Sequence, residues 1–128
     1  MNKKNINRKI TKMALEYCVK TFGLSKFNGS IPNMIVKRNR LKDDKRCRGF
    51  YSAAINTIVI FPIAHTSFID IVNTVIHEYT HYLQDLEMYN IFYRSHGYDA
   101  HPQEIEADTI ATEHQWMCKN YIKERMSK

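Results

Sequence analysis

The segment His77-Glu-Tyr-Thr-His81 has the residue types and the spacing of a metal site. On a helix, residues four positions apart lie on one face, so His77 and His81 can hold one ion between them. Two imidazoles suit a borderline-soft ion such as Zn²⁺. Glu78 is rotated by about 100° from His77, which puts its carboxylate beside the open side of the ion, where it can take a proton from a water that attacks a carbonyl. The spacing therefore predicts two metal ligands and a general base on one helical turn.

A second acidic segment, Glu104-Ile-Glu-Ala-Asp108, offers candidates for the rest of the site. A catalytic zinc site usually takes three protein ligands and keeps a fourth position open. We therefore predict Glu104 as the third ligand. Asp108, four residues later on the same face, is predicted to accept the spare N–H of a ligand histidine, by preference His77. Glu106 and His101 remain alternative third ligands, because acidic residues also gather in the first turn of a helix for electrostatic reasons.

Hydrophobic periodicity indicates the elements that must position these residues. Apolar residues at steps of three and four predict a helix from Asn7 to Gly23. Short runs rich in β-branched and aromatic residues predict three strands. These runs are Met34–Lys37, Gly49–Ala53 and Ile55–Phe61.

The helix that carries the histidines is expected to begin after Ser67, a favoured N-cap residue with Asp70 three positions later. A stripe of apolar residues from Phe68 to Leu86 then predicts about five turns. Together, the predicted elements indicate an α+β fold with an N-terminal helix and a small twisted sheet of about three strands, followed by two helices. We expect one domain over residues 1–128.

The last helix is expected to begin at Pro102, a residue favoured at the first helical position, and to run past Tyr121. Ala107 and Ala111 are small enough to let it approach the histidine helix closely. Residues 89–101 are expected to form an aromatic and histidine-rich loop. The residues that we expect to pack in the core or between helices are Trp116, Met117, Tyr121 and a hydrogen-bonded His114. The histidines expected at the surface, without an assigned partner, are His65 and His96.

The composition is 44% hydrophobic and 25% charged, which is typical of a globular protein and not of a disordered or fibrous one. We expect no signal peptide, no transmembrane helix and no membrane partner, because no apolar run is long enough. The predicted location is cytoplasmic, with a particle such as a phage virion as an alternative. The cysteines, Cys18, Cys47 and Cys118, are odd in number and widely spaced, without a CxxC pair. This pattern does not indicate a disulfide framework and fits a reducing compartment.

The net charge of +6 is concentrated in the first twenty residues and in the segment 37–48, KRNRLKDDKRCR. Such a segment can bind nucleic acid, anionic lipid or an acidic substrate. No nucleic-acid-binding motif accompanies it, so we favour a solvated loop between two strands over nucleic acid as a partner. The sequence leaves the oligomeric state open.

The two motifs together resemble the glutamate-zincin metallopeptidases. Their signature is HExxH and, on a downstream helix, a Glu ligand followed four residues later by Asp, often as ExxAD. This chain matches with Glu104, Ala107 and Asp108, and the resemblance spans roughly residues 49–120. A metzincin is excluded, because that family has Gly and then His or Asp where this chain has Gln84 and Glu87.

This resemblance favours the minimal single-domain members of the family. It implies a zincin-like fold, Zn²⁺ as the cofactor and a peptide or protein as the substrate. It also implies hydrolysis of a peptide bond with Glu78 as the general base, and a sheet edge that pairs with the extended substrate. Larger members stabilise the oxyanion with Tyr or His side chains. We predict Tyr98 for this role, with His101 as the next candidate, because both precede the ligand helix.

Two other classes of function remain open. In a non-catalytic zincin-like module, zinc would join two helices and the basic segment would bind a partner or nucleic acid. A fourth ligand, such as His96 or His101, would indicate such a closed structural site. The other class is a metal-free interaction protein within a larger assembly, which would retain no metal at neutral pH.

Overall fold

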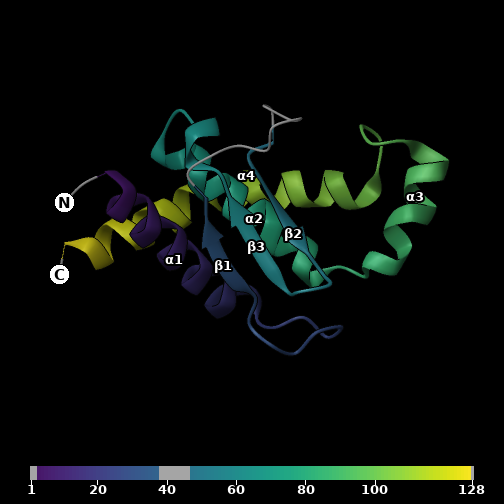
Figure 1. The fold of residues 1–128 in the computed structure, drawn as a ribbon, viewed down its shortest axis with the longest axis horizontal. Helices are drawn as coiled ribbons and strands as arrows, with labels where there is room; N and C mark the ends of the chain where they lie inside the picture. Colours follow the sequence, from purple (N-terminus) through teal and green to yellow (C-terminus); the bar gives the residue numbers. More distant parts are fainter. Residues whose placement is uncertain (1–2, 38–46, 128) are drawn as a thin grey trace.

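The computed structural model of the protein describes residues 3–37 and 47–127 (Figure 1). The segment 38–46, most of the predicted basic loop, lies outside the described residues. The elements in chain order are α1 (Lys3–Phe22), β1 (Asn33–Val36), β2 (Gly49–Ser52), β3 (Thr57–Ile60), the 3-10 turn η1 (Pro62–Ala64), α2 (Phe68–Leu83), the 3-10 turn η2 (Leu86–Met88), α3 (Tyr89–His96) and α4 (Pro102–Met126). This architecture confirms the predicted α+β class.

The sheet has the strand order β1-β3-β2, with β1 parallel and β2 antiparallel to β3. The central strand β3 is buried at all four positions, which its β-branched sequence Thr-Ile-Val-Ile suits. Strand β2 is an edge of the sheet and contacts α2. Gly49 permits this contact, because a Cβ at that position would lie 2.6 Å from the Val59 carbonyl oxygen and 3.1 Å from Cγ2 of Thr74 on α2.

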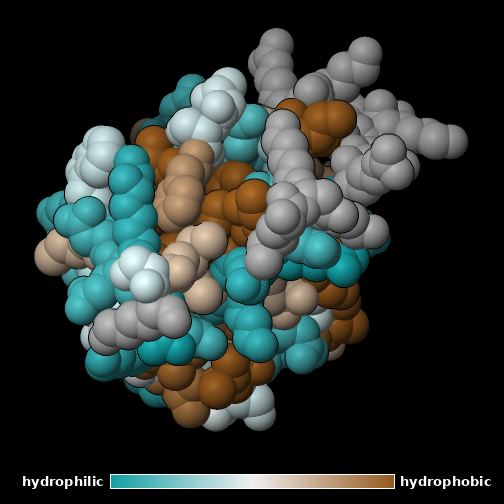
Figure 2. All heavy atoms as spheres, turned by 90° about the vertical axis from the view of Figure 1, so that its left-hand side faces the viewer, coloured by the Kyte–Doolittle hydropathy of each residue, from teal (hydrophilic) through white to brown (hydrophobic). Residues whose placement is uncertain are grey.

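The helix α2 lies at the centre of the fold and packs against α1, α4 and the strands β2 and β3. Figure 1 shows the sheet in front of these helices, with α3 at the end opposite the two termini. Seen from the end where the termini lie, apolar side chains form strips between hydrophilic ones (Figure 2). Among the helices of residues 3–37 and 47–127, none combines the length and the apolar character needed to cross a membrane.

The core is built around the apolar face of α2. Its Val72, Val75 and Ile76 are completely buried, and so is Tyr79, whose hydroxyl donates to the Gly23 carbonyl. These contacts fix α2 against α1 and the sheet. The other core residues are Ile10, Ala14, Tyr17, Cys18, Ile58, Ile60, Ile71, Tyr82, Ala111, Cys118 and Ile122.

The start of α2 agrees with its predicted cap. The Ser67 side chain accepts from the backbone N–H of Asp70 at 3.3 Å. The Asp70 carboxylate reaches back one residue further than in a standard capping box, to the backbone N–H and hydroxyl of Thr66. This cap fixes where the helix begins and therefore which face carries the two histidines.

Three expectations about the elements after the sheet were wrong. The helix α2 ends at Leu83 and not at Leu86, because Gln84 has an extended backbone. Most of the expected loop 89–101 is helical, as α3. On α4, Trp116 and Met117 are exposed, because a helix this long meets α1 and α2 along one face only.

His65 also differs from its predicted surface role. Its two ring nitrogens lie 2.8 Å from the Phe61 carbonyl and 2.8 Å from the Thr74 hydroxyl, so it joins the turn before α2 to α2 itself. His114 is partly buried and lies 2.9 Å from the Tyr17 hydroxyl, as expected of a hydrogen-bonded histidine between helices.

Replacing Gly49 by alanine should destabilise the protein. The new Cβ would lie 2.6 Å from a backbone oxygen of the neighbouring strand, so β2 must move, at a cost of about 1–3 kcal/mol. Chemical denaturation measures this change in the free energy of unfolding. Gly29→Ala is the control, since a Cβ there meets nothing within 4 Å, and it should stay within about 1 kcal/mol of the wild type. Equal stability of the two variants would contradict the close approach of β2.

Candidate metal centre

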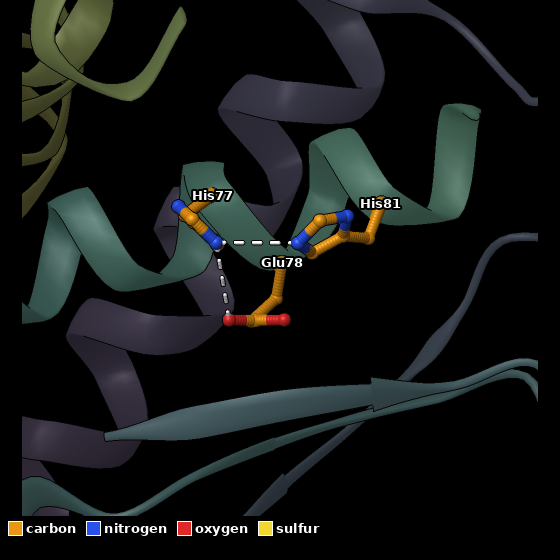
Figure 3. A group of neighbouring side chains, drawn as sticks. All are labelled: His77, Glu78 and His81. Carbon is orange, nitrogen blue, oxygen red and sulfur yellow. Dashed lines mark hydrogen bonds and ion pairs between the residues drawn. The ribbon is translucent and has the colours of Figure 1, made fainter. Parts of the chain in front are cut away.

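His77 and His81 lie one turn apart on α2 with their Nε2 atoms 3.2 Å from each other (Figure 3). The Glu78 side chain leaves the helix toward the strands of the sheet, and its Oε2 is 3.9 Å from His77 Nε2. Potential ligand atoms of these three residues all lie within 4.8 Å of one another. The cluster could therefore hold a metal ion.

Glu104, in the first turn of α4, completes the arrangement. Its Oε1 atom is 3.1 Å from Nε2 of His77 and 3.1 Å from Nε2 of His81. The three atoms thus form a nearly equilateral triangle with edges of 3.1–3.2 Å. A tetrahedral zinc ion with bonds of roughly 2.0–2.1 Å separates its ligand atoms by about 3.3–3.4 Å, so the triangle fits such an ion closely.

The Nδ1 atoms of both histidines have partners of their own. His77 Nδ1 is 2.9 Å from a carboxylate oxygen of Asp108, and His81 Nδ1 is 2.7 Å from the amide oxygen of Gln84. Because these oxygens only accept, each neutral ring carries its proton on Nδ1 and leaves a lone pair on Nε2. Two lone pairs then face one carboxylate oxygen, an arrangement that a cation relieves. The donor set suits Zn²⁺ for this reason as well as by ligand type.

The second oxygen of Glu104 is occupied by Tyr89 from α3. The Tyr89 hydroxyl donates to Glu104 Oε2 at 2.7 Å. Burial and the neighbouring Glu104 carboxylate raise the pKa of Tyr89, so the hydroxyl keeps the proton that it donates. The contact turns Oε1 toward the histidines. The sequence analysis missed Tyr89, because nothing in a segment read as a loop distinguishes it from the other aromatic residues there.

The alternative ligands have other contacts. His101 is completely buried at the N-cap of α4, where Nδ1 accepts from the Gln103 backbone N–H and Nε2 donates to the Tyr89 carbonyl. A carboxylate oxygen of Glu106 accepts from the Gln84 amide at 2.9 Å. His96 is exposed near the end of α3, with Nδ1 3.3 Å from the Phe92 carbonyl oxygen. The fold thus brings Glu104 to the two histidines, whereas these three side chains are engaged elsewhere.

The ionisable groups of the cluster shift one another's pKa. Burial raises the pKa of Glu78 to about 7, against the opposing effects of His77 and His81. Burial also acts to raise the pKa of Glu104, but the two histidine rings against Oε1 and the hydrogen bond from Tyr89 outweigh it and leave this pKa far below its usual range. Burial acts to lower the pKa of both histidines, and the two carboxylates reverse this into an increase.

A cleft runs between β2 and the cluster of His77, Glu78 and His81. It consists of two hollows of about 430 and 400 Å³, both lined by Gly49, His77, Glu78 and Tyr98. The larger continues along β2 past Tyr51 to Leu86 and Tyr89, and the smaller continues to Arg48, Asn73 and Asp108. Tyr98 is more than half exposed at this cleft. The predicted site residues therefore all line this cleft. His77, Glu78 and Tyr98 line both hollows, whereas His81 and Glu104 line the larger hollow and Asp108 the smaller one.

Compared with models of protein families, with curated proteins and with solved structures, the chain matches none. The interpretation of the cluster therefore depends on its own residues and geometry.

We predict that the purified protein binds about one zinc ion per chain. Glu104→Gln should weaken the zinc affinity more than about 100-fold, because loss of a residue that only supports a ligand typically costs about 10–100-fold. The substitution keeps the shape of the side chain but removes the charge that faces both histidines. Chelator competition and elemental analysis measure the affinity and the stoichiometry. Glu113→Gln makes the same chemical change at an exposed position of the same helix and should leave the affinity nearly unchanged. A similar loss in both variants would contradict the assignment of Glu104.

Proposed function

We propose that the protein is a zinc-dependent metallopeptidase that hydrolyses peptide bonds in the cleft along β2. The observation that supports this most strongly is the convergence of His77 Nε2, His81 Nε2 and Glu104 Oε1 at mutual distances of 3.1–3.2 Å. A buried carboxylate, Glu78, lies beside this triangle and lines the same cleft. Three ligands with an adjacent carboxylate and an open side are the arrangement of a catalytic zinc site and not of a closed one.

When bound, Zn²⁺ supplies a Lewis acid for the scissile carbonyl and lowers the pKa of a water to about 7. Glu78 takes a proton from the attacking water and passes it to the amine that leaves. Its position suits both transfers, because its carboxylate lies 3.9 Å from His77 Nε2 and faces the cleft between α2 and β2. Each of the three proposed ligands is held by one further residue. Asp108 holds His77, Gln84 holds His81, and Tyr89 holds Glu104, which limits the movement of the ligands during the reaction.

Strand β2 supplies the surface that holds an extended substrate. As an edge strand it pairs with β3 on one side only, and residues 49–51 line the cleft on the other. A peptide added along this edge gains main-chain hydrogen bonds without a requirement for particular side chains. Tyr98 lines the same cleft, and in this mechanism its hydroxyl donates a hydrogen bond to the oxyanion that forms at the scissile carbonyl.

A purely structural zinc site is less well supported. Such a site is closed by four protein ligands, and the two histidines considered as a fourth have other contacts. His101 uses both ring nitrogens in backbone hydrogen bonds, and His96 is exposed on α3. A structural site also gains nothing from a buried carboxylate such as Glu78 beside the ion.

Glu78→Gln should abolish peptide hydrolysis and leave zinc binding intact. The amide keeps the size of the side chain but cannot accept a proton, and loss of a general base costs on the order of 10²–10⁴-fold in rate. Hydrolysis of a quenched-fluorescent peptide library by the zinc-loaded protein is the measurement. Glu87→Gln, at an exposed position of η2, should keep full activity. Activity of the Glu78 variant within tenfold of the wild type would remove Glu78 from the role of base.

Tyr98→Phe should lower kcat about 10²–10³-fold, as expected for the loss of one oxyanion donor, with little change in KM. The reason is that the hydroxyl would contact the substrate oxygen mainly in the transition state. The matched control is Tyr93→Phe on α3, a similarly exposed tyrosine that does not line the cleft. If Tyr98→Phe has the kcat of the control, another group stabilises the oxyanion.

A further inference from the structure

We propose that Gln84 is a positioning residue of the metal centre. Its side-chain amide holds the His81 ring in one tautomer and ties that ring to the start of α4, so that His81 Nε2 meets Glu104 Oε1. The inference rests on the proposed zinc site and adds a residue for which the sequence motifs provide no signal.

Gln84 reaches His81 because α2 ends there. Its backbone is extended, with φ −83° and ψ 159°, and its N–H bonds to the His81 carbonyl. The side chain then turns back, and its amide oxygen lies 2.7 Å from His81 Nδ1. With 8% of its surface exposed, Gln84 is buried. Water therefore competes little for this hydrogen bond.

The orientation of the amide follows from its other partners. Gln84 Nε2 lies 2.9 Å from the Gln103 carbonyl oxygen and 2.9 Å from a carboxylate oxygen of Glu106. Both of these groups are acceptors, so the NH₂ group must face them and the amide oxygen must face His81. His81 consequently carries its proton on Nδ1 and directs the lone pair of Nε2 toward Glu104. The neutral amide both donates and accepts, which a carboxylate at this position could not do.

The same amide connects two of the three metal ligands. Gln103 directly precedes Glu104, so the bond to its carbonyl fixes the backbone next to one ligand while the bond to His81 fixes the ring of another. His77 is held differently, by the Asp108 carboxylate, whose side chain is 73% exposed. The site thus has one imidazole supported by an exposed anion and one supported by a buried neutral group. Removing the Gln84 amide leaves buried polar atoms of its neighbours without a hydrogen-bond partner, which should disturb the site more than removing the exposed Asp108 carboxylate.

The first test compares the zinc affinities of Gln84→Met and Gln115→Met. Gln115 accepts from the Asn73 side chain at 3.0 Å, which is also a hydrogen bond between α2 and α4, but it does not contact the histidines. Met preserves the length of the side chain and removes its hydrogen bonds. We expect chelator competition to show a 10–100-fold weaker affinity for Gln84→Met and a change within about twofold for Gln115→Met. Gln84→Asn, which keeps an amide but shortens its reach, should fall between them and serves if Gln84→Met does not fold.

The second test records the ¹⁵N chemical shifts of the imidazoles in the metal-free protein at alkaline pH, where the rings are neutral. His81 should carry its proton on Nδ1 in the wild type, and Gln84→Met should populate the Nε2–H form without changing His77. A wild-type His81 in the Nε2–H form would overturn the proposal.

The outcomes separate the two proposals. A wild-type chain that binds no zinc overturns the proposed function and with it the role of Gln84 at a metal. A wild type that binds zinc, together with a Gln84→Met affinity equal to that of Gln115→Met, overturns the role of Gln84 alone.

Discussion

The close packing of α4 against α2 is the contact on which the site depends. Ala107 and Ala111 are completely buried on the inner face of α4, and their small side chains let the two helices approach. Glu104 lies one turn before Ala107 on this face, so it projects toward His77 and His81. Packed helices lie about 8–10 Å apart depending on the side chains between them. A larger residue at either alanine would therefore act directly on the distance from Glu104 to the histidines.

This packing brings several ionisable groups into a poorly hydrated space, which is costly unless each group finds a partner. Most of the polar atoms of the cluster do. Asp108 and Gln84 accept hydrogen bonds from Nδ1 of the histidines, and the Tyr89 hydroxyl donates to one oxygen of Glu104. What remains inside the triangle are the Nε2 lone pairs and the Oε1 atom of Glu104. A bound cation neutralises this remainder, so metal binding and the stability of the α2–α4 contact are linked.

The sequence was sufficient for the parts of this arrangement that follow from short-range periodicity. The spacing of His77 and His81 and the capping by Ser67 are properties of a single helix, and the α+β class was confirmed. Tyr89 and Gln84 could not be predicted, because their roles arise from contacts between elements. Gln84 reaches the site only because α2 ends before it. Tyr89 belongs to an eight-residue helix too short for a clear periodic pattern.

His101, an alternative ligand in the sequence analysis, supports the candidate site by joining two helices. Its Nε2 donates to the Tyr89 carbonyl, and its Nδ1 caps α4. The centroids of the His101 and Tyr89 rings are 4.0 Å apart. His101 therefore joins the first residue of α3 to the first turn of α4, where Glu104 lies. Tyr89 can bond to Glu104 because this histidine holds the two helices at that separation. The position of Glu104 beside the two histidines thus depends on a buried histidine whose own ring nitrogens both bond to backbone groups.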